Sequence, residues 1–126
     1  MDDKDKATIL YADQIKTVAK AWGRELWIHN DEQYCGKILE IDKGSRFSMH
    51  FHKLKTETWY VISGKLKFEW INFPSGDWHT AVTLEPGMSI HIPAGFAHRL
   101  TGLTRDVRIM EVSTQHFDSD SYRIER

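Results

Sequence analysis

The sequence lacks the features that mark secreted, membrane-spanning or nucleic-acid-binding proteins. It has one cysteine in 126 residues, so no disulfide can form within the chain, and Cys35 is predicted to be a buried thiol or a thiol that reaches into a pocket. Its apolar runs are short and its start, M-D-D-K-D-K, is charged, which excludes a spanning helix and a signal peptide. Seventeen basic against eighteen acidic side chains create no field that attracts nucleic acid or an anionic membrane. We therefore expect a cytoplasmic protein that binds neither.

The remaining sequence is rich in strand signals. From Val18 onward, short runs of Ile, Val, Tyr, Trp and Thr alternate with turn chemistry at N-D-E, D-K-G-S, S-G-K, E-P-G and P-A-G. Roughly eight to ten strands at this spacing predict an all-β sandwich or barrel. The length allows a single domain, which we assign to residues 13–126, after a polar N-terminal arm at residues 1–12. Residues 13–22 have helical spacing, but the segment is too short and uncapped to predict a helix.

Residues 37–52 are predicted to form two antiparallel strands around the D-K-G-S turn. Alternate side chains of a strand share a face, so His50 and His52 point the same way, with Arg46 and Ser48 before them on that face. The other face carries Phe47, Met49 and Phe51. Apolar residues opposite the histidines indicate a strand that is packed on both sides, with the histidine face lining a polar cavity.

Two imidazoles on one strand face, with Cα atoms roughly 6.6 to 6.8 Å apart, can converge on a single cation. A carboxylate such as that of Glu57, from the neighbouring strand, would complete a ligand set suited to Mn, Fe, Co, Ni or Zn. A single cysteine argues against a closed structural zinc site, so an open site is expected. The histidine pair alone also occurs by chance. The second segment, residues 87–98, strengthens the hypothesis because it predicts a strand, a Pro/Gly turn and then His98 in the next strand.

Both segments resemble the two motifs of the cupin family. The first fits G-x5-H-x-H-x4-E-x6-G and the second fits G-x5-P-x-G-x2-H, and the fixed positions are Gly44, His50, His52, Glu57, Gly64, Gly87, Pro93, Gly95 and His98. The resemblance implies a double-stranded β-helix, or jelly-roll barrel, that binds a divalent transition metal. The implied ligands are His50, His52, Glu57 and His98. The final asparagine of the family motif, which is not a ligand, is replaced here by Gly102.

A wider likeness covers most of the chain and resembles the C-terminal cupin domain of type II phosphomannose isomerases. It rests on segments such as Y-C-G-K-I-L-E-I, E-T-W-Y-V-I-S-G and I-P-A-G-F-A-H-R-L. Those enzymes often join this domain to a mannose-1-phosphate guanylyltransferase, and we expect only the isomerase half here. The family usually has Gln at the position of His50 and ends in a Gly-rich acidic tail, whereas this chain reads Q-H-F-D-S-D-S-Y-R-I-E-R. The metal preference and the phosphomannose specificity therefore stay open.

Isomerisation of a sugar needs a cation near the developing negative charge and a base within reach of the moving proton. The candidates for the base are Glu111, Lys37 and His91, although Lys37 and Glu111 could equally form a structural ion pair. Arg46 is expected on the face of His50, where its guanidinium would orient a phosphate or hydroxyl groups.

The other aromatic and histidine residues receive simpler assignments. Trp59 is predicted either to stack on a sugar ring or to pack in the core. Surface positions are expected for His29, His79 and His116. Packing or a subunit interface is expected for Trp22, Trp27, Trp70 and Trp78.

Three classes of function follow from these patterns. The leading hypothesis is an aldose–ketose isomerase whose small-molecule substrate is a sugar or a sugar phosphate. A non-haem metal-dependent dioxygenase is the first alternative, because three histidines and one glutamate with open positions also suit dioxygen chemistry. A non-catalytic carbohydrate-binding protein is the second. The N-terminal arm and the five tryptophans favour a homodimer.

Overall fold

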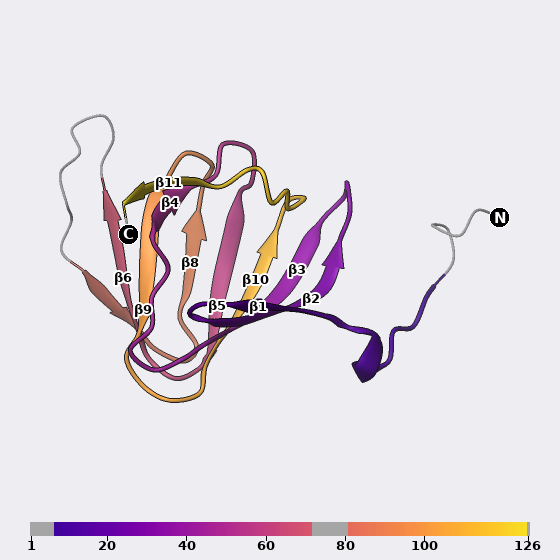
Figure 1. Ribbon diagram of the computed structural model, residues 1–126, viewed down its shortest axis with the longest axis horizontal. Helices are drawn as coiled ribbons and strands as arrows, with labels where there is room; N and C mark the ends of the chain where they lie inside the picture. The colour runs from indigo at the N-terminus through magenta and orange to yellow at the C-terminus, as the bar shows by residue number, and fades with distance from the viewer. Residues whose placement is uncertain (1–6, 72–80, 126) are drawn as a thin grey trace.

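The computed structural model describes residues 7–71 and 81–125 and consists of two antiparallel sheets, which Figure 1 shows. The larger sheet has the order β1-β2-β3-β10-β5-β8. Its strands are β1 (Lys16–Lys20), β2 (Gly23–Asn30), β3 (Cys35–Ile41), β10 (Val107–Ser113), β5 (Glu57–Ser63) and β8 (Ser89–Ile92). The smaller sheet has the order β11-β4-β9-β6-β7. Its strands are β11 (Tyr122–Glu125), β4 (Met49–Phe51), β9 (Ala97–Gly102), β6 (Leu66–Ile71) and β7 (Val82–Leu84).

The fold confirms the predicted all-β jelly roll in a single domain. The two described ranges contain eleven strands, slightly more than the eight to ten that were predicted. Residues 13–22 form part of a 3₁₀ turn (Ala12–Gln14) and then β1, and Figure 1 shows the preceding chain leading away from both sheets. Among the described residues, no helix has the length and hydropathy that a membrane span requires. The predictions for His79 and Trp78 lie outside the described residues.

The predicted pairing of residues 37–52 is wrong. The D-K-G-S turn carries the chain from β3 in the larger sheet to β4 in the smaller one, so these two strands belong to different sheets and do not pair. The backbone N–H of Gly44 donates to the carbonyl of Gly102 at 2.9 Å, and that of Gly102 donates to Ser45 at 2.9 Å. A Cβ atom on Gly102 would lie 2.8 Å from the Asp42 carbonyl oxygen. The crossover thus needs glycine at this position, where the family motif has asparagine.

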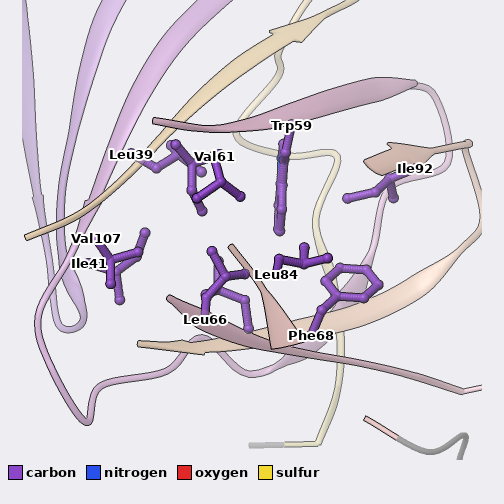
Figure 2. Close-up of a cluster of buried hydrophobic side chains, with 11 residues drawn as sticks. Leu39, Ile41, Trp59, Val61, Leu66, Phe68, Leu84, Ile92 and Val107 are labelled. Atoms are coloured by element: carbon purple, nitrogen blue, oxygen red, sulfur yellow. The ribbon is translucent and has the colours of Figure 1, made fainter. Parts of the chain in front are cut away.

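The apolar core fills the space between the sheets. Figure 2 shows side chains of both sheets pointing toward one another, including Leu39, Val61, Leu66, Leu84 and Phe68. Burial of each such side chain contributes about 1.5 to 3 kcal/mol to the free energy of unfolding. Trp59 is 1% exposed and belongs to this cluster, so the core-packing alternative holds for Trp59.

Gly64, the last glycine of the first motif, allows the turn between β5 and β6 to approach the start of β10 closely. Its φ is +74°, and an added Cβ atom would lie 2.7 Å from the Cα of Val107. Any other residue would both strain the backbone and push β10 away. The motif glycine therefore has a steric role in the barrel wall.

On the inner face of the larger sheet, a row of register partners that includes charged side chains lies next to a row of apolar ones. Lys37 of β3 is the partner of Glu111 in β10, and Glu111 is the partner of Trp59 in β5. Two positions further along, Ile109 pairs with Leu39 and with Val61. The inner face is therefore charged near one end of the barrel and apolar toward the other.

Candidate metal centre

Three histidines converge at the charged end of the barrel. His50 lies in β4 and is the register partner of His98 in β9, while His52 follows the end of β4. One ring nitrogen from each histidine lies within 4.8 Å of those of the other two. This arrangement brings together the three predicted histidines and could hold a metal ion.

Each of the three rings is oriented by a backbone carbonyl. The Nδ1 atoms of His50 and His98 lie 2.8 and 2.9 Å from the carbonyl oxygens two residues earlier in the chain. The Nδ1 of His52 lies 2.5 Å from the carbonyl oxygen of Asp120. A carbonyl only accepts hydrogen bonds, so each Nδ1 carries the proton and each Nε2 keeps a lone pair. Orientation of a ligand ring through its other nitrogen is typical of metal-binding histidines.

Burial keeps the three imidazoles neutral. It lowers the pKa of His50, lowers that of His52 to about 4 and lowers that of His98 well below its usual value. A neutral imidazole is the form that binds a metal ion. The Nε2 of His98 and the Oε2 of Glu57 are also buried without a hydrogen-bond partner in the described part of the chain. Two buried polar atoms without a hydrogen-bond partner, in residues that both contribute to this region, fit a bound cation.

Glu57 lies at the edge of the histidine group. Its side chain is 2% exposed, and its Oε2 is 3.4 Å from the Nε2 of His52. Its Oε1 accepts a hydrogen bond from Trp59 Nε1 at 2.5 Å. Burial, together with the nearby carboxylate of Glu111, raises the pKa of Glu57 to about 7. Among the described residues, the compact 4.8 Å group contains the histidines alone, so Glu57 as a ligand stays a prediction.

A cavity of about 610 Å³ lies beside this group. The predicted site residues that line it are Lys37, Arg46, His50, His52, Glu57 and Glu111. Arg46 is exposed and forms an isolated bridge with Thr101 of β9. His91, in contrast, is exposed, and its Nδ1 lies 3.3 Å from the Oγ1 of Thr58 on the outer face of the larger sheet. His91 is therefore no candidate for a base in this cavity.

Lys55 is a buried cavity residue that the sequence motifs do not indicate. Its side chain is 4% exposed, and its Nζ donates to Glu111 Oε2 at 3.1 Å and to His116 Nδ1 at 3.2 Å. The same Nζ lies 3.8 Å from Glu57 Oε2. Although burial alone would raise the pKa of Glu111, the ammonium groups of Lys55 and Lys37 outweigh it and lower that pKa. Glu111 is therefore an ionised carboxylate near neutral pH.

The neighbouring lysine has a different partner. Lys37 is 2% exposed, and its Nζ lies 3.2 Å from Glu25 Oε1 and 4.3 Å from the centre of the Trp27 ring. Lys37 and Glu111 are thus partners in the strand register. The shortest ion pair of Lys37 is with Glu25, and that of Glu111 is with Lys55.

His116 contradicts the prediction of a surface histidine. Its side chain is 12% exposed, lines the cavity and contacts Lys55 and Asp118. Asn30 holds its backbone from both sides, at 2.8 and 3.0 Å. A tail histidine with no neighbouring motif gives no signal of this burial, and neither does a lysine in a short loop. Cys35 is 1% exposed, as its buried-thiol alternative predicts.

The fold and the site define the class of protein. Residues 37–113 match the model of a family described as the cupin domain, and the chain belongs to this family.

Individual relatives are more distant. The mannose-1-phosphate guanylyltransferase of Salmonella muenchen is 25% identical over 112 residues, which cover 86% of this chain and 22% of that protein. This chain therefore spans about a fifth of that relative's length.

Solved structures show the same fold at low identity. CapF, a capsular polysaccharide assembling protein from Staphylococcus aureus, has a TM-score of 0.77 at 18% identity, over 93% of this chain and 37% of CapF. Oxalate decarboxylase from Bacillus subtilis has a TM-score of 0.77 at 14% identity, over 97% of this chain and 34% of the enzyme. KdgF from Halomonas sp. has a TM-score of 0.72 at 15% identity, over 90% of this chain and 98% of KdgF. At these identities the likeness establishes the fold alone.

Proposed function

We propose that this chain is a metal-dependent isomerase that interconverts an aldose and a ketose, with a sugar or a sugar phosphate as substrate. One observation carries the proposal: two histidines of the neutral three-histidine group, His50 and His52, line the same cavity of about 610 Å³ as the ionised carboxylate of Glu111. Isomerisation needs a cation and a base at one place. The name of the guanylyltransferase relative adds support for a sugar phosphate.

We assign His50, His52, His98 and Glu57 as the ligands of a divalent transition metal, which is Zn, Mn, Fe, Co or Ni. The orphaned atoms of His98 and Glu57 and the three carbonyl-oriented rings support this set. The metal would stabilise negative charge on the sugar oxygens during the reaction.

The charged residues of the larger sheet would move the proton. Glu111 is the proposed base: its carboxylate takes the proton from the carbon next to the carbonyl and returns it to the neighbouring carbon. Lys37 lies beside it in the register and helps to keep it ionised. Arg46, exposed at the cavity, would hold the phosphate or a hydroxyl group of the sugar.

A thermal-shift screen of the metal-loaded protein against aldoses, ketoses and their phosphates tests the proposal. A ligand at 100 times its Kd stabilises the folded state by about 2.7 kcal/mol, and a stabilising sugar would then be followed for conversion by NMR. A flat screen with metal present would rule out a sugar substrate. Copurified iron together with oxygen consumption would favour the dioxygenase instead, and sugar binding without conversion would favour a carbohydrate-binding protein.

We also propose that the protein is a cytoplasmic homodimer that pairs through the outer face of the larger sheet. A register row of apolar residues crosses four strands there, namely Leu26, Ile38, Met110 and Tyr60. Met110 is 41% and Tyr60 46% exposed, and Val112 nearby is 51% exposed. Burial of such a patch favours association. Sedimentation of the parent and of Met110→Lys measures it, and a monomeric parent would refute the dimer.

A further inference from the structure

Beyond the histidines, one acidic residue of the C-terminal segment touches the loop between two of the proposed ligands at several points. Asp120 is 3% exposed. Its Oδ1 accepts from the backbone N–H of Lys53 at 2.8 Å, and its Oδ2 accepts from that of Lys55 at 3.0 Å. The N–H of Leu54, between them, lies 3.2 Å from both oxygens. One carboxylate thus binds three consecutive amides.

The same residue also orients a histidine through its main chain. The carbonyl oxygen of Asp120 lies 2.5 Å from Nδ1 of His52. The backbone and the side chain of Asp120 therefore act on adjoining positions, the ring of His52 and the loop that follows it. Strand β11 begins two residues later and pairs with β4, with Arg123 as the partner of His50, which holds Asp120 beside the loop.

The loop that Asp120 binds spans the two sheets. His52 follows β4 of the smaller sheet, and Glu57 begins β5 of the larger one, so only residues 53–56 separate them. The conformation of these four residues sets the distance between the two side chains. It also places Lys55, whose ammonium lies 3.8 Å from Glu57 Oε2. A carboxylate that accepts hydrogen bonds from three consecutive amides restrains this conformation strongly, because charge-assisted bonds exceed neutral ones in strength.

We propose that Asp120 is a positioning residue for the metal site, which fixes the loop between His52 and Glu57 and the ring of His52 before the ion arrives. This inference rests on the proposed metal site. Residues that orient ligands without touching the metal typically change metal affinity 10- to 100-fold when mutated.

The variant Asp120→Asn tests the proposal, because an amide turns a donor toward one of the backbone N–H groups. The matched control is Asp31→Asn. The Oδ1 of Asp31 also accepts backbone N–H groups, those of Gln33 and Tyr34 at 2.8 and 3.1 Å, but in a turn away from the cavity. Affinities for Zn²⁺ and Co²⁺ are measured by competition with a chromogenic chelator, and the visible spectrum of bound Co²⁺ reports the ligand geometry.

We expect Asp120→Asn to bind both ions about 10- to 100-fold more weakly with an altered Co²⁺ spectrum, and Asp31→Asn to match the parent. Equal affinities and spectra in the parent and Asp120→Asn would overturn the inference, as would an equal loss in both variants. A parent that binds neither ion would instead refute the metal site itself.

A measurement on the unaltered protein covers the case in which Asp120→Asn fails to fold. Coupling between two events is reciprocal, so if the bound loop favours metal binding, the metal must favour the bound loop. Hydrogen exchange of the amides of Lys53, Leu54 and Lys55 is expected to slow on addition of Zn²⁺, beyond any change at Gln33 and Tyr34. Unchanged exchange at the three loop amides in the zinc-bound protein would overturn the inference.

Discussion

The cavity has two walls, one formed by the smaller sheet and one by the larger sheet. The buried polar groups of the two walls differ in charge state. The smaller sheet provides histidines, and burial holds them neutral, with pKa values lowered as for His52, to about 4. The larger sheet provides two carboxylates beside the ammonium of Lys55: the pKa of Glu111 is lowered despite burial, because Lys55 and Lys37 lie near it, whereas burial raises the pKa of Glu57 to about 7. One wall is therefore suited to receive a cation, and the other to accept and return protons. Metal binding and proton transfer are thus assigned to different walls, and mutations can test each one separately.

The largest effect is expected from Glu111→Gln, which changes only the charged wall. Loss of the proposed base should lower the isomerisation rate by roughly 10² to 10⁴-fold, the usual contribution of general base catalysis. Metal content should stay at the parent level, because Glu111 lies outside the histidine group. Rate measurements on metal-loaded protein, with metal content by mass spectrometry, check both parts. A variant with the parent's rate would remove Glu111 from the mechanism.

Lys55→Met should cause the next largest effect, this time on stability. Without the ammonium, the carboxylates of Glu57 and Glu111 lose a buried counter-charge at 3.8 and 3.1 Å. Removal of one partner from a buried ion pair typically lowers the free energy of unfolding by about 3 to 5 kcal/mol. Urea denaturation of the metal-free proteins measures it. The control Lys65→Met removes a pair in which both side chains are 55% exposed, and should cost at most about 1 kcal/mol. An equal decrease in the free energy of unfolding for Lys55→Met and Lys65→Met would contradict the expected difference between a buried and an exposed ion pair.

His98→Gln changes the histidine wall and should weaken metal binding. His98 is fully buried and its Nε2 has no partner in the described part of the chain. Loss of one ligand should weaken Zn²⁺ binding by roughly 100-fold or more, since each ligand supplies a large share of the binding free energy. Chelator competition measures the affinity. Retention of the parent's affinity would exclude His98 from the ligand set.

The last prediction concerns the response of the metal-free protein to acid, in which the histidines and Glu57 act in opposite directions. His52 has a folded pKa of about 4 and an unfolded pKa near 6.5, so between these pH values the unfolded chain binds more protons. The free energy of unfolding therefore falls as the pH drops from 6.5 to 4, by at most about 3 kcal/mol from this residue. His50 and His98 shift in the same direction.

Glu57 opposes this trend. Its pKa is raised to about 7 from a model-compound value of 4.5, so the stability that it contributes is complete below pH 4.5 and is lost as the pH rises to 7. Urea denaturation between pH 7 and pH 4.5 should show a net loss in acid, and His52→Gln should reduce the slope. A slope that is identical in parent and variant would contradict the assignment of His52 as a buried neutral imidazole.

The histidine wall of the smaller sheet could be predicted from the sequence far better than the charged wall. His50, His52 and His98 lie in fixed local spacings, and a strand imposes a period of two on its side chains wherever it packs. The choice of sheet for β4 could not be predicted, because the same alternation fits a neighbour of β3 and a strand on the opposite sheet. Lys55 escaped detection because its burial depends on Glu111, 56 residues away in the chain. A short lysine-containing loop looks solvent-exposed until this partner is known.

The position of β10 has a consequence for synthesis of the protein on the ribosome. β10 lies between β3 and β5, as Figure 1 shows, and pairs with both. Until residues 107–113 emerge, the larger sheet has a gap at its centre, and the facing edges of β3 and β5 expose unpaired N–H and C=O groups. Such edges pair readily with other chains. The nascent chain therefore passes through a stage with two open edges before the barrel closes, and this is the stage at which a chaperone would protect it.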